Sequence, residues 1–97
     1  MSKLFNLNII SPEKIIYSGE ISSLVVPAQL GYLGVLADHA PLIANLTPGK
    51  ISFKDVSRKL NVIDSKSNGI LEVLKNNASI LLDSTDEPVY NLEIRQN

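Results

Sequence analysis

Residues 31–42 of the chain have the sequence Gly-Tyr-Leu-Gly-Val-Leu-Ala-Asp-His-Ala-Pro-Leu, and residues 46–51 have the sequence Leu-Thr-Pro-Gly-Lys-Ile. Together these stretches contain the only histidine, three of the five glycines and two of the five prolines. Two glycines three residues apart in an apolar segment predict a tight backbone excursion where side chains would not fit. The Pro48-Gly49 pair predicts a turn that opens a new strand.

Short runs of alternating apolar and polar residues, separated by turn residues, predict strands along the rest of the chain. Ser18-Gly19 and Pro27 are expected to end the second and third of these strands. Asn68-Gly69 predicts a turn with positive φ, and Asn76-Asn77 predicts a hairpin. The strands are short and no helical period of useful length is present. We therefore expect an all-β fold, an antiparallel β-sandwich or flattened barrel of about eight to ten short strands.

The composition bounds the class of protein. With 97 residues, 44% of them hydrophobic and only 5% aromatic, the chain is expected to form one small domain with an aliphatic core. Nine basic residues face ten acidic ones, which is not the footprint of a protein that binds nucleic acid. The absence of cysteine excludes a disulfide framework and a thiolate metal site. The sequence has neither a secretory signal nor an apolar run of membrane-spanning length, so we expect no direct membrane insertion.

The end of the chain is expected to form a short tail. We place the β-sandwich domain at residues 1–84 and the tail at residues 85–97. Tyr90, Leu92 and Ile94 alternate with polar residues, which favours a terminal strand over a helix. Only nine residues follow Pro88, at about 1.5 Å each in a helix, so the tail is too short for a carboxy-terminal helical hairpin.

Asp38 and His39 are the obvious candidates for acid–base chemistry, since histidine titrates near neutral pH and a carboxylate can orient it. Adjacent residues rarely aim their side chains at each other, however, and no nucleophile or metal-ligand spacing accompanies this pair. The ring nitrogens of His39 are instead expected to hydrogen-bond nearby backbone and to hold the bend at Ala40-Pro41. The sequence predicts no catalytic, metal or cofactor site.

The two glycines of residues 31–34 have a structural interpretation. Gly31 and Gly34 are expected to serve backbone geometry, with Gly34 permitting close approach of strands while Tyr32 and Leu33 project outward. Tyr32 also has a functional interpretation, because an aromatic residue at a strand or loop tip is a common interface anchor.

Several motifs, taken in order, resemble the amino-terminal β-sandwich domain of the epsilon subunit of rotary (F-type) ATP synthase. The most specific are residues 31–41, similar to the family's Gly-x-x-Gly-Ile/Val…His-Ala-Pro-Leu stretch, and residues 46–49, similar to its Leu-x-Pro-Gly. Weaker matches extend the resemblance to most of the chain, from about residue 7 to residue 83. Asn68 replaces the first glycine of a Gly-Gly pair, and asparagine is the other residue best suited to positive φ.

The resemblance implies a non-catalytic central-stalk (rotor) subunit without a cofactor, on the cytoplasmic face of a bacterial inner membrane. Within a hetero-oligomer it would clamp the foot of the gamma subunit and contact the c-ring, so that proton or sodium flow is coupled to ATP synthesis. The resemblance implies a ring-facing interface at Gly31, Tyr32, Leu33, Gly34, Asp38, His39, Ala40 and Pro41, and structural turns at Pro48, Gly49, Asn68 and Gly69. Long members of the family carry a helical hairpin that can block ATP hydrolysis, and some bind ATP against it. We expect this short form to do neither.

Two other functions are weighed against the rotor interpretation. A free-standing β-sandwich could bind a small ligand or a carbohydrate, but this requires a concave site lined with aromatic residues, and three tyrosines and two phenylalanines scattered along the chain offer little for one. A small hydrolase that uses His39 would show turnover in the isolated chain. Both are less consistent with the sequence than a rotor subunit.

Overall fold

The computed structural model of the chain describes residues 3–83 and the backbone of residues 89–92. These residues form nine strands and no helix, so none of them belongs to a helix that could cross a membrane. The predicted all-β fold is therefore confirmed. The strands are β1 (Phe5–Ser11), β2 (Lys14–Ala28), β3 (Gly31–Val35), β4 (Leu42–Leu46), β5 (Gly49–Asp55), β6 (Leu60–Ser65), β7 (Gly69–Leu74), β8 (Asn77–Leu82) and β9 (Val89–Leu92).

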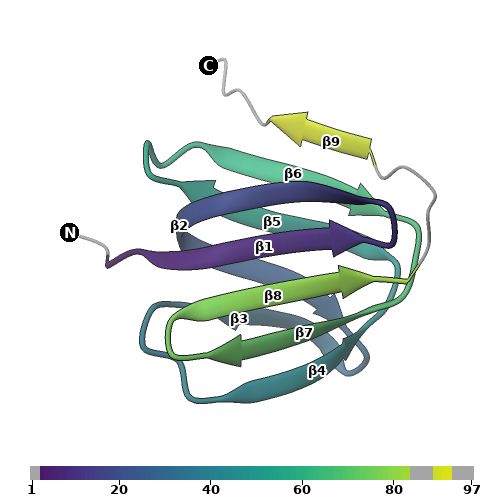
Figure 1. The fold of residues 1–97 in the computed structure, drawn as a ribbon, viewed down its shortest axis with the longest axis horizontal. Coiled ribbons are helices and arrows are strands. Elements are labelled where there is room, and N and C mark those ends of the chain that lie inside the picture. The colour runs from purple at the N-terminus through teal and green to yellow at the C-terminus, as the bar shows by residue number, and fades with distance from the viewer. Residues whose placement is uncertain (1–2, 84–88, 93–97) are drawn as a thin grey trace.

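The strands form two layers that share one long strand (Figure 1). One layer contains β4, β7, β8, β1 and the first half of β2, and the other contains β3, the second half of β2, β5, β6 and β9. A single bridge from Ala28 of β2 to Leu46 of β4 joins the layers a second time. The pairing of β1 with β8 is parallel, and the other described pairings are antiparallel. The result is a sandwich partly closed into a flattened barrel.

The strand breaks expected at Ser18-Gly19 and Pro27 are wrong, because strand β2 runs through both. Gly19 is not a turn residue. A Cβ there would lie 2.9 Å from the Tyr17 hydroxyl, so the glycine makes room for the Tyr17 side chain. Proline removes only its own N–H from a strand, and the Pro27 carbonyl still accepts a hydrogen bond from the Thr47 backbone N–H at 2.8 Å. The real change of direction is a register irregularity between Ile21 and Ser23, where β2 passes from β1 to β5.

The core lies between the layers and is aliphatic apart from two phenylalanines, as the composition predicts. The side chains of Leu7, Ile9, Ile21, Ile63 and Ile80 are completely buried. They lie at alternate positions of their strands, as period-2 patterning requires. The Tyr17 ring packs at the margin of this core, 4.4 Å from the Phe53 ring between centroids.

The predicted terminal strand is confirmed over Val89–Leu92, which pairs antiparallel with β6. The predicted position of Ile94 in that strand, and the proposed boundary between residues 84 and 85, lie outside the described residues. The hairpin predicted at Asn76-Asn77 is confirmed between β7 and β8, with its turn one residue earlier, at Lys75 and Asn76.

Candidate docking site at the two ends of strand β3

The structure divides the expected ring-facing residues between opposite ends of β3 (Figure 1). Gly31 begins β3 and pairs with Ala28 of β2. Ala28 is also bridged to Leu46 of β4, and Leu46 pairs with Gly69 of β7. We call this end of the sandwich the Gly69 end. Residues 38–41 follow β3 at the other end, next to the β7–β8 turn, which we call the Asp38 end. β3 spans about 13 Å at 3.3 Å per residue, so the two halves of the set lie toward different ends of this strand.

The Gly69 end carries exposed apolar side chains around a shallow hollow. Leu30, in the β2–β3 turn, is fully exposed, and Tyr32 is 64% exposed. The Tyr32 hydroxyl lies 3.5 Å from the backbone N–H of Lys50, which donates to it. A hollow of about 350 Å³ lies between the β2–β3 turn with β3 on one side and β4, including Ile43, on the other. This end therefore offers an uncovered apolar surface with an aromatic anchor.

Of Gly31 and Gly34, only Gly31 has a backbone conformation that favours glycine. Its φ is +125°, a conformation that side chains disfavour, although a Cβ there would meet nothing within 4 Å. The expected role of Gly34 is wrong, because a Cβ at Gly34 would also meet nothing within 4 Å and no close approach of strands occurs there. Tyr32 is exposed as expected, whereas Leu33 is only half-exposed and packs against the core.

The two structural turns at the Gly69 end depend on close packing. A Cβ at Gly49 would lie 2.8 Å from Pro27 Cβ. Neither Asn68 nor Gly69 has positive φ, so the expected φ at this pair is wrong. Gly69 is instead buried, and a Cβ there would lie 2.5 Å from the carbonyl oxygen of Leu81. The glycine is required because the neighbouring strand backbone leaves no room for a side chain.

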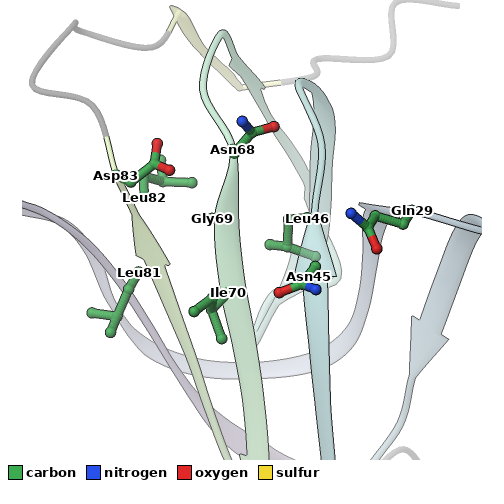
Figure 2. Close-up of a pocket in the computed structure, with 9 residues that line it drawn as sticks. All are labelled: Gln29, Asn45, Leu46, Asn68, Gly69, Ile70, Leu81, Leu82 and Asp83. Atoms are coloured by element: carbon green, nitrogen blue, oxygen red, sulfur yellow. The ribbon is translucent and has the colours of Figure 1, made fainter.

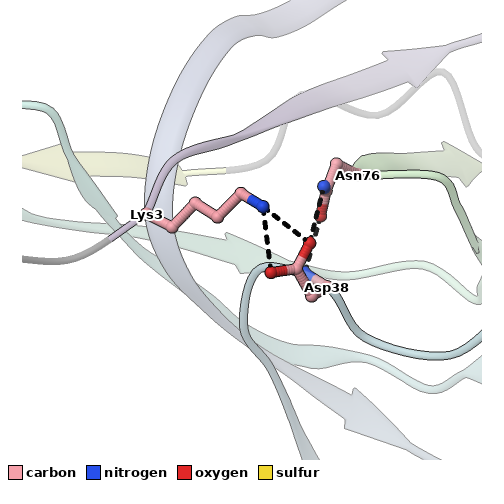
Figure 3. Close-up of polar contacts among 3 residues, drawn as sticks. All are labelled: Lys3, Asp38 and Asn76. Carbon is pink, nitrogen blue, oxygen red and sulfur yellow. Dashed lines mark hydrogen bonds and ion pairs between the residues drawn. The ribbon is translucent and has the colours of Figure 1, made fainter.

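Asp38 is the centre of a polar cluster that fixes the loop between β3 and β4 (Figure 3). The Lys3 ammonium donates to both carboxylate oxygens at 3.0 Å, and Asn76 Nδ2 donates to Asp38 Oδ1 at 3.0 Å. In return, the Asp38 backbone N–H donates to Asn76 Oδ1 at 2.6 Å. Hydrogen bonds from Asn76 and then from Lys3 hold the pKa of the Asp38 carboxyl below its ordinary value of 3.8. The cluster ties three separate segments together at the Asp38 end.

His39 does not form a dyad with Asp38. Its Nδ1 lies 2.7 Å from the carbonyl oxygen of Ala40, so the ring donates to the backbone there and the expected role in holding the Ala40-Pro41 bend is confirmed. The Asp38 carboxylate is engaged by Lys3 and Asn76 instead. Among the described residues, no group of three or more His, Cys, Asp or Glu side chains is placed to hold a metal ion.

Asp55 stabilises the β5–β6 turn in a similar way. Its Oδ1 accepts hydrogen bonds from the backbone N–H groups of Lys59 at 3.0 Å and Ser57 at 2.9 Å. These bonds, led by that from Lys59, hold the pKa of the Asp55 carboxyl below 3.8. Burial raises the pKa of Tyr17, and the nearby charge of Asp55 adds to this rise.

A second hollow, of about 380 Å³, lies beside the first on the β4–β7–β8 surface at the Gly69 end (Figure 2). Amide and carboxyl groups, including those of Asn45, Asn68 and Asp83, share its wall with Ile70 and Leu81. It has no aromatic lining residue, so it lacks the platform on which a sugar ring would stack.

Sequence reasoning missed the partners of Asp38, because Lys3 and Asn76 lie 35 and 38 residues away in the chain. No local signal marks such a long-range pair. It also missed that Leu30 and Ile43 are exposed, because a local pattern does not show which apolar side chains stay uncovered.

The fold and the site define the chain as an all-β sandwich domain with loops fixed at both ends. Residues 4–88 match the family described as ATP synthase, Delta/Epsilon chain, beta-sandwich domain, and the chain belongs to that family. It is 45% identical over 78 residues to the ATP synthase epsilon chain of Leptospira borgpetersenii serovar Hardjo-bovis, covering 80% of this chain and 60% of the relative. It is 33% identical over 96 residues to that of Desulforamulus reducens, covering 99% of this chain and 70% of the relative.

Two solved structures share the fold. A chain in the Euglena gracilis mitochondrial ATP synthase, OSCP/F1/c-ring, aligns with a TM-score of 0.76 at 20% identity, covering 87% of this chain and 51% of that one. A chain in the Tetrahymena thermophila mitochondrial ATP synthase central stalk and c-ring aligns with a TM-score of 0.63 at 16% identity, covering 86% and 66%. This chain spans about three-fifths of the length of the first curated relatives it matches.

Proposed function

We propose that the chain is a non-catalytic central-stalk subunit of a rotary ATP synthase at the cytoplasmic face of a bacterial inner membrane. It binds the gamma subunit and contacts the c-ring, and so helps to couple proton or sodium flow to ATP synthesis without a cofactor of its own. The match of residues 4–88 to the delta/epsilon β-sandwich family carries this proposal. The names of the curated relatives and the central-stalk origin of the structural neighbours support it.

The Gly69 end is the better candidate for the ring contact. It presents Leu30 and Tyr32 to solvent, whereas the charged and polar groups of Asp38 and His39 bond within the chain. We therefore assign the ring contact to the Gly31–Leu33 half of the expected set, together with Leu30. Residues 38–41, at the Asp38 end, act in the loop that joins β3 to β4.

No observation favours the ligand-binding module or the hydrolase. Both hollows are shallow, and Tyr32 is the one aromatic residue that lines either of them. The Asp38 carboxylate and the His39 ring are directed to different partners.

Co-expression with the gamma subunit of the same organism tests the proposed function. We expect the two proteins to elute together in size-exclusion chromatography. A chain that stays monomeric beside a folded gamma subunit would refute the proposal.

The ring contact is tested in the assembled ATP synthase with Leu30→Ser and Tyr32→Ser. We expect both to lower ATP-driven ion pumping relative to ATP hydrolysis, because they remove exposed apolar contacts, and to leave the gamma complex intact. His39→Ala at the Asp38 end is the control. If His39→Ala uncouples pumping and the two serine variants do not, the ring contacts the other end.

A further inference from the structure

The outer face of the β1–β8 layer carries a continuous apolar row across four strands. Ile70 of β7 pairs with Leu81 of β8, Leu81 pairs with Ile10 of β1, and Ile10 pairs with Ile15 of β2. With about 4.8 Å between strands, the row is about 14 Å long. Ile15 is 66% exposed, Leu81 53% and Ile70 45%. Asn45 of β4 pairs with Ile70 and ends the row on that side.

A β-bulge explains why two isoleucines of this row face solvent. Ile9 pairs with Tyr17, but Ile10 pairs with Ile15, so Ile16 is the extra residue of β2. In such a bulge both residues of the widened step lie on one side of the sheet. Ile16 and Tyr17 both pack against the core. Ile15 is thereby turned outward, beside Ile10.

The rest of this face is mixed: Ile43 of β4, which pairs with Glu72, and Leu74 of β7 are also exposed there, and the charged groups at outward positions are carboxylates. The adjacent row contains Glu72 paired with Ser79, and the next contains Glu20 paired with Asn6. Lys14, which precedes Ile15 in β2, is the one exposed lysine or arginine in the described strands of this layer. The outer face of the other layer differs, because β5 presents Lys50 and Lys54 there at the alternate positions to buried Ile51 and Phe53. The apolar row therefore lies beside the carboxylates of Glu72 and Glu20, with one lysine next to its Ile15 end.

We propose that this apolar row, Ile70–Leu81–Ile10–Ile15, is the surface on which the chain docks its gamma partner. This rests on the proposed function. The partner surface has an apolar ridge that covers the row and lysine or arginine side chains that face Glu72 and Glu20. Apolar contacts at the centre supply affinity, and the charges at the side set orientation and the rate of encounter.

A second copy of the chain fits this face poorly. In a two-fold dimer through the row, both copies would bring Glu72 and Glu20 to the interface, and like charges across an interface disfavour association. A partner with basic side chains removes that penalty.

The test is titration calorimetry of the full chain with the purified gamma subunit. Ile15→Thr and Leu81→Thr introduce a β-branched side chain, which strands favour, and they remove most of the exposed hydrocarbon at these two positions. Val56→Thr is the matched control, since Val56 is 61% exposed in the β5–β6 turn, away from the row. We expect each row variant to raise Kd about fivefold or more and the control to leave it unchanged. Glu72→Gln should reduce the salt dependence of binding.

Row variants that bind as well as Val56→Thr would overturn the docking surface and leave the proposed function standing. A wild-type chain that does not bind gamma at all would refute the proposed function itself. Self-association of the wild-type chain that Ile15→Thr abolishes would assign the row to a second copy. Methyl NMR of the wild-type chain needs no variant: the signals of Ile10, Ile15 and Ile70 should shift on addition of gamma while that of Val56 does not, and the opposite result refutes the surface.

Discussion

Alanine substitutions at three glycines separate close packing from backbone strain. At Gly69 a Cβ would lie 2.5 Å from the Leu81 carbonyl oxygen and 3.1 Å from Leu82 Cδ2. At Gly34 a Cβ would meet nothing within 4 Å, and φ is not positive. At Gly31 the space is equally open, but φ is +125°. The three sites thus present a steric clash, no obstacle, and strain alone.

The magnitudes follow from these geometries. Gly69→Ala forces two paired strands apart, which costs about 1–3 kcal/mol of unfolding free energy. The less flexible unfolded chain returns only about 0.4–1 kcal/mol. For a domain of this size, we expect Tm to fall by about 5–15 °C. Gly31→Ala incurs backbone strain of about 1–3 kcal/mol and is also destabilised. Gly34→Ala should be neutral or up to about 1 kcal/mol more stable than wild type.

Thermal and urea unfolding, followed by far-UV circular dichroism, measure all three variants against wild type. If Gly69→Ala unfolds at the wild-type midpoint, the adjacent strand has room for a side chain and the steric explanation is wrong. If Gly34→Ala loses as much stability as Gly69→Ala, the loss comes from replacing any strand glycine and not from close packing.

Two further predictions concern exposed turns. The Asp38 and Asp55 carboxyls have pKa values held below 3.8, so the stability that they contribute is fully present above that pH and is lost as the pH falls through their lowered pKa values. Thermal melts from about pH 5 to about pH 2 should show a fall in Tm that Asp55→Asn makes shallower, and an equal fall in that variant would contradict this origin. Lys75 has φ of 49° and Asn76 φ of 60°, both positive, so Lys75→Asn should raise the unfolding free energy by about 0.5–1 kcal/mol, and a lower urea midpoint would contradict it.

The strands of the fold were largely predictable, because alternation of apolar and polar residues is a local property. The β7–β8 hairpin was correctly placed from two such runs on either side of Asn76-Asn77. Prediction from the sequence failed at Gly19 and Pro27, where residues that usually end strands lie inside β2. At Gly19 the Tyr17 side chain occupies the space of a Cβ, and at Pro27 the carbonyl oxygen still accepts a backbone hydrogen bond. Neither cause is visible without the neighbouring residues in space.

The candidate site was less predictable than the fold. The Gly31–Pro41 motif indicated which residues matter but not that they lie at two ends of the sandwich. The consecutive isoleucines at 9–10 and 15–16 were a usable signal of the apolar row. Strict alternation would bury only one residue of each pair, so the second isoleucine indicates either a bulge or an exposed apolar position. The structure shows that both occur there.

Strand β2 links the two proposed surfaces within one hydrogen-bonded element. Its first half carries Ile15 of the apolar row, and after the register irregularity between Ile21 and Ser23 its second half pairs with Gly31 and Tyr32 of the proposed ring contact. Both tips of β2 therefore lie at the Gly69 end, one in each layer (Figure 1). Force applied by the ring at Tyr32 would pass through paired strands to the docking row. A β-sandwich suits this task because its close-packed interior is stiff and transmits strain.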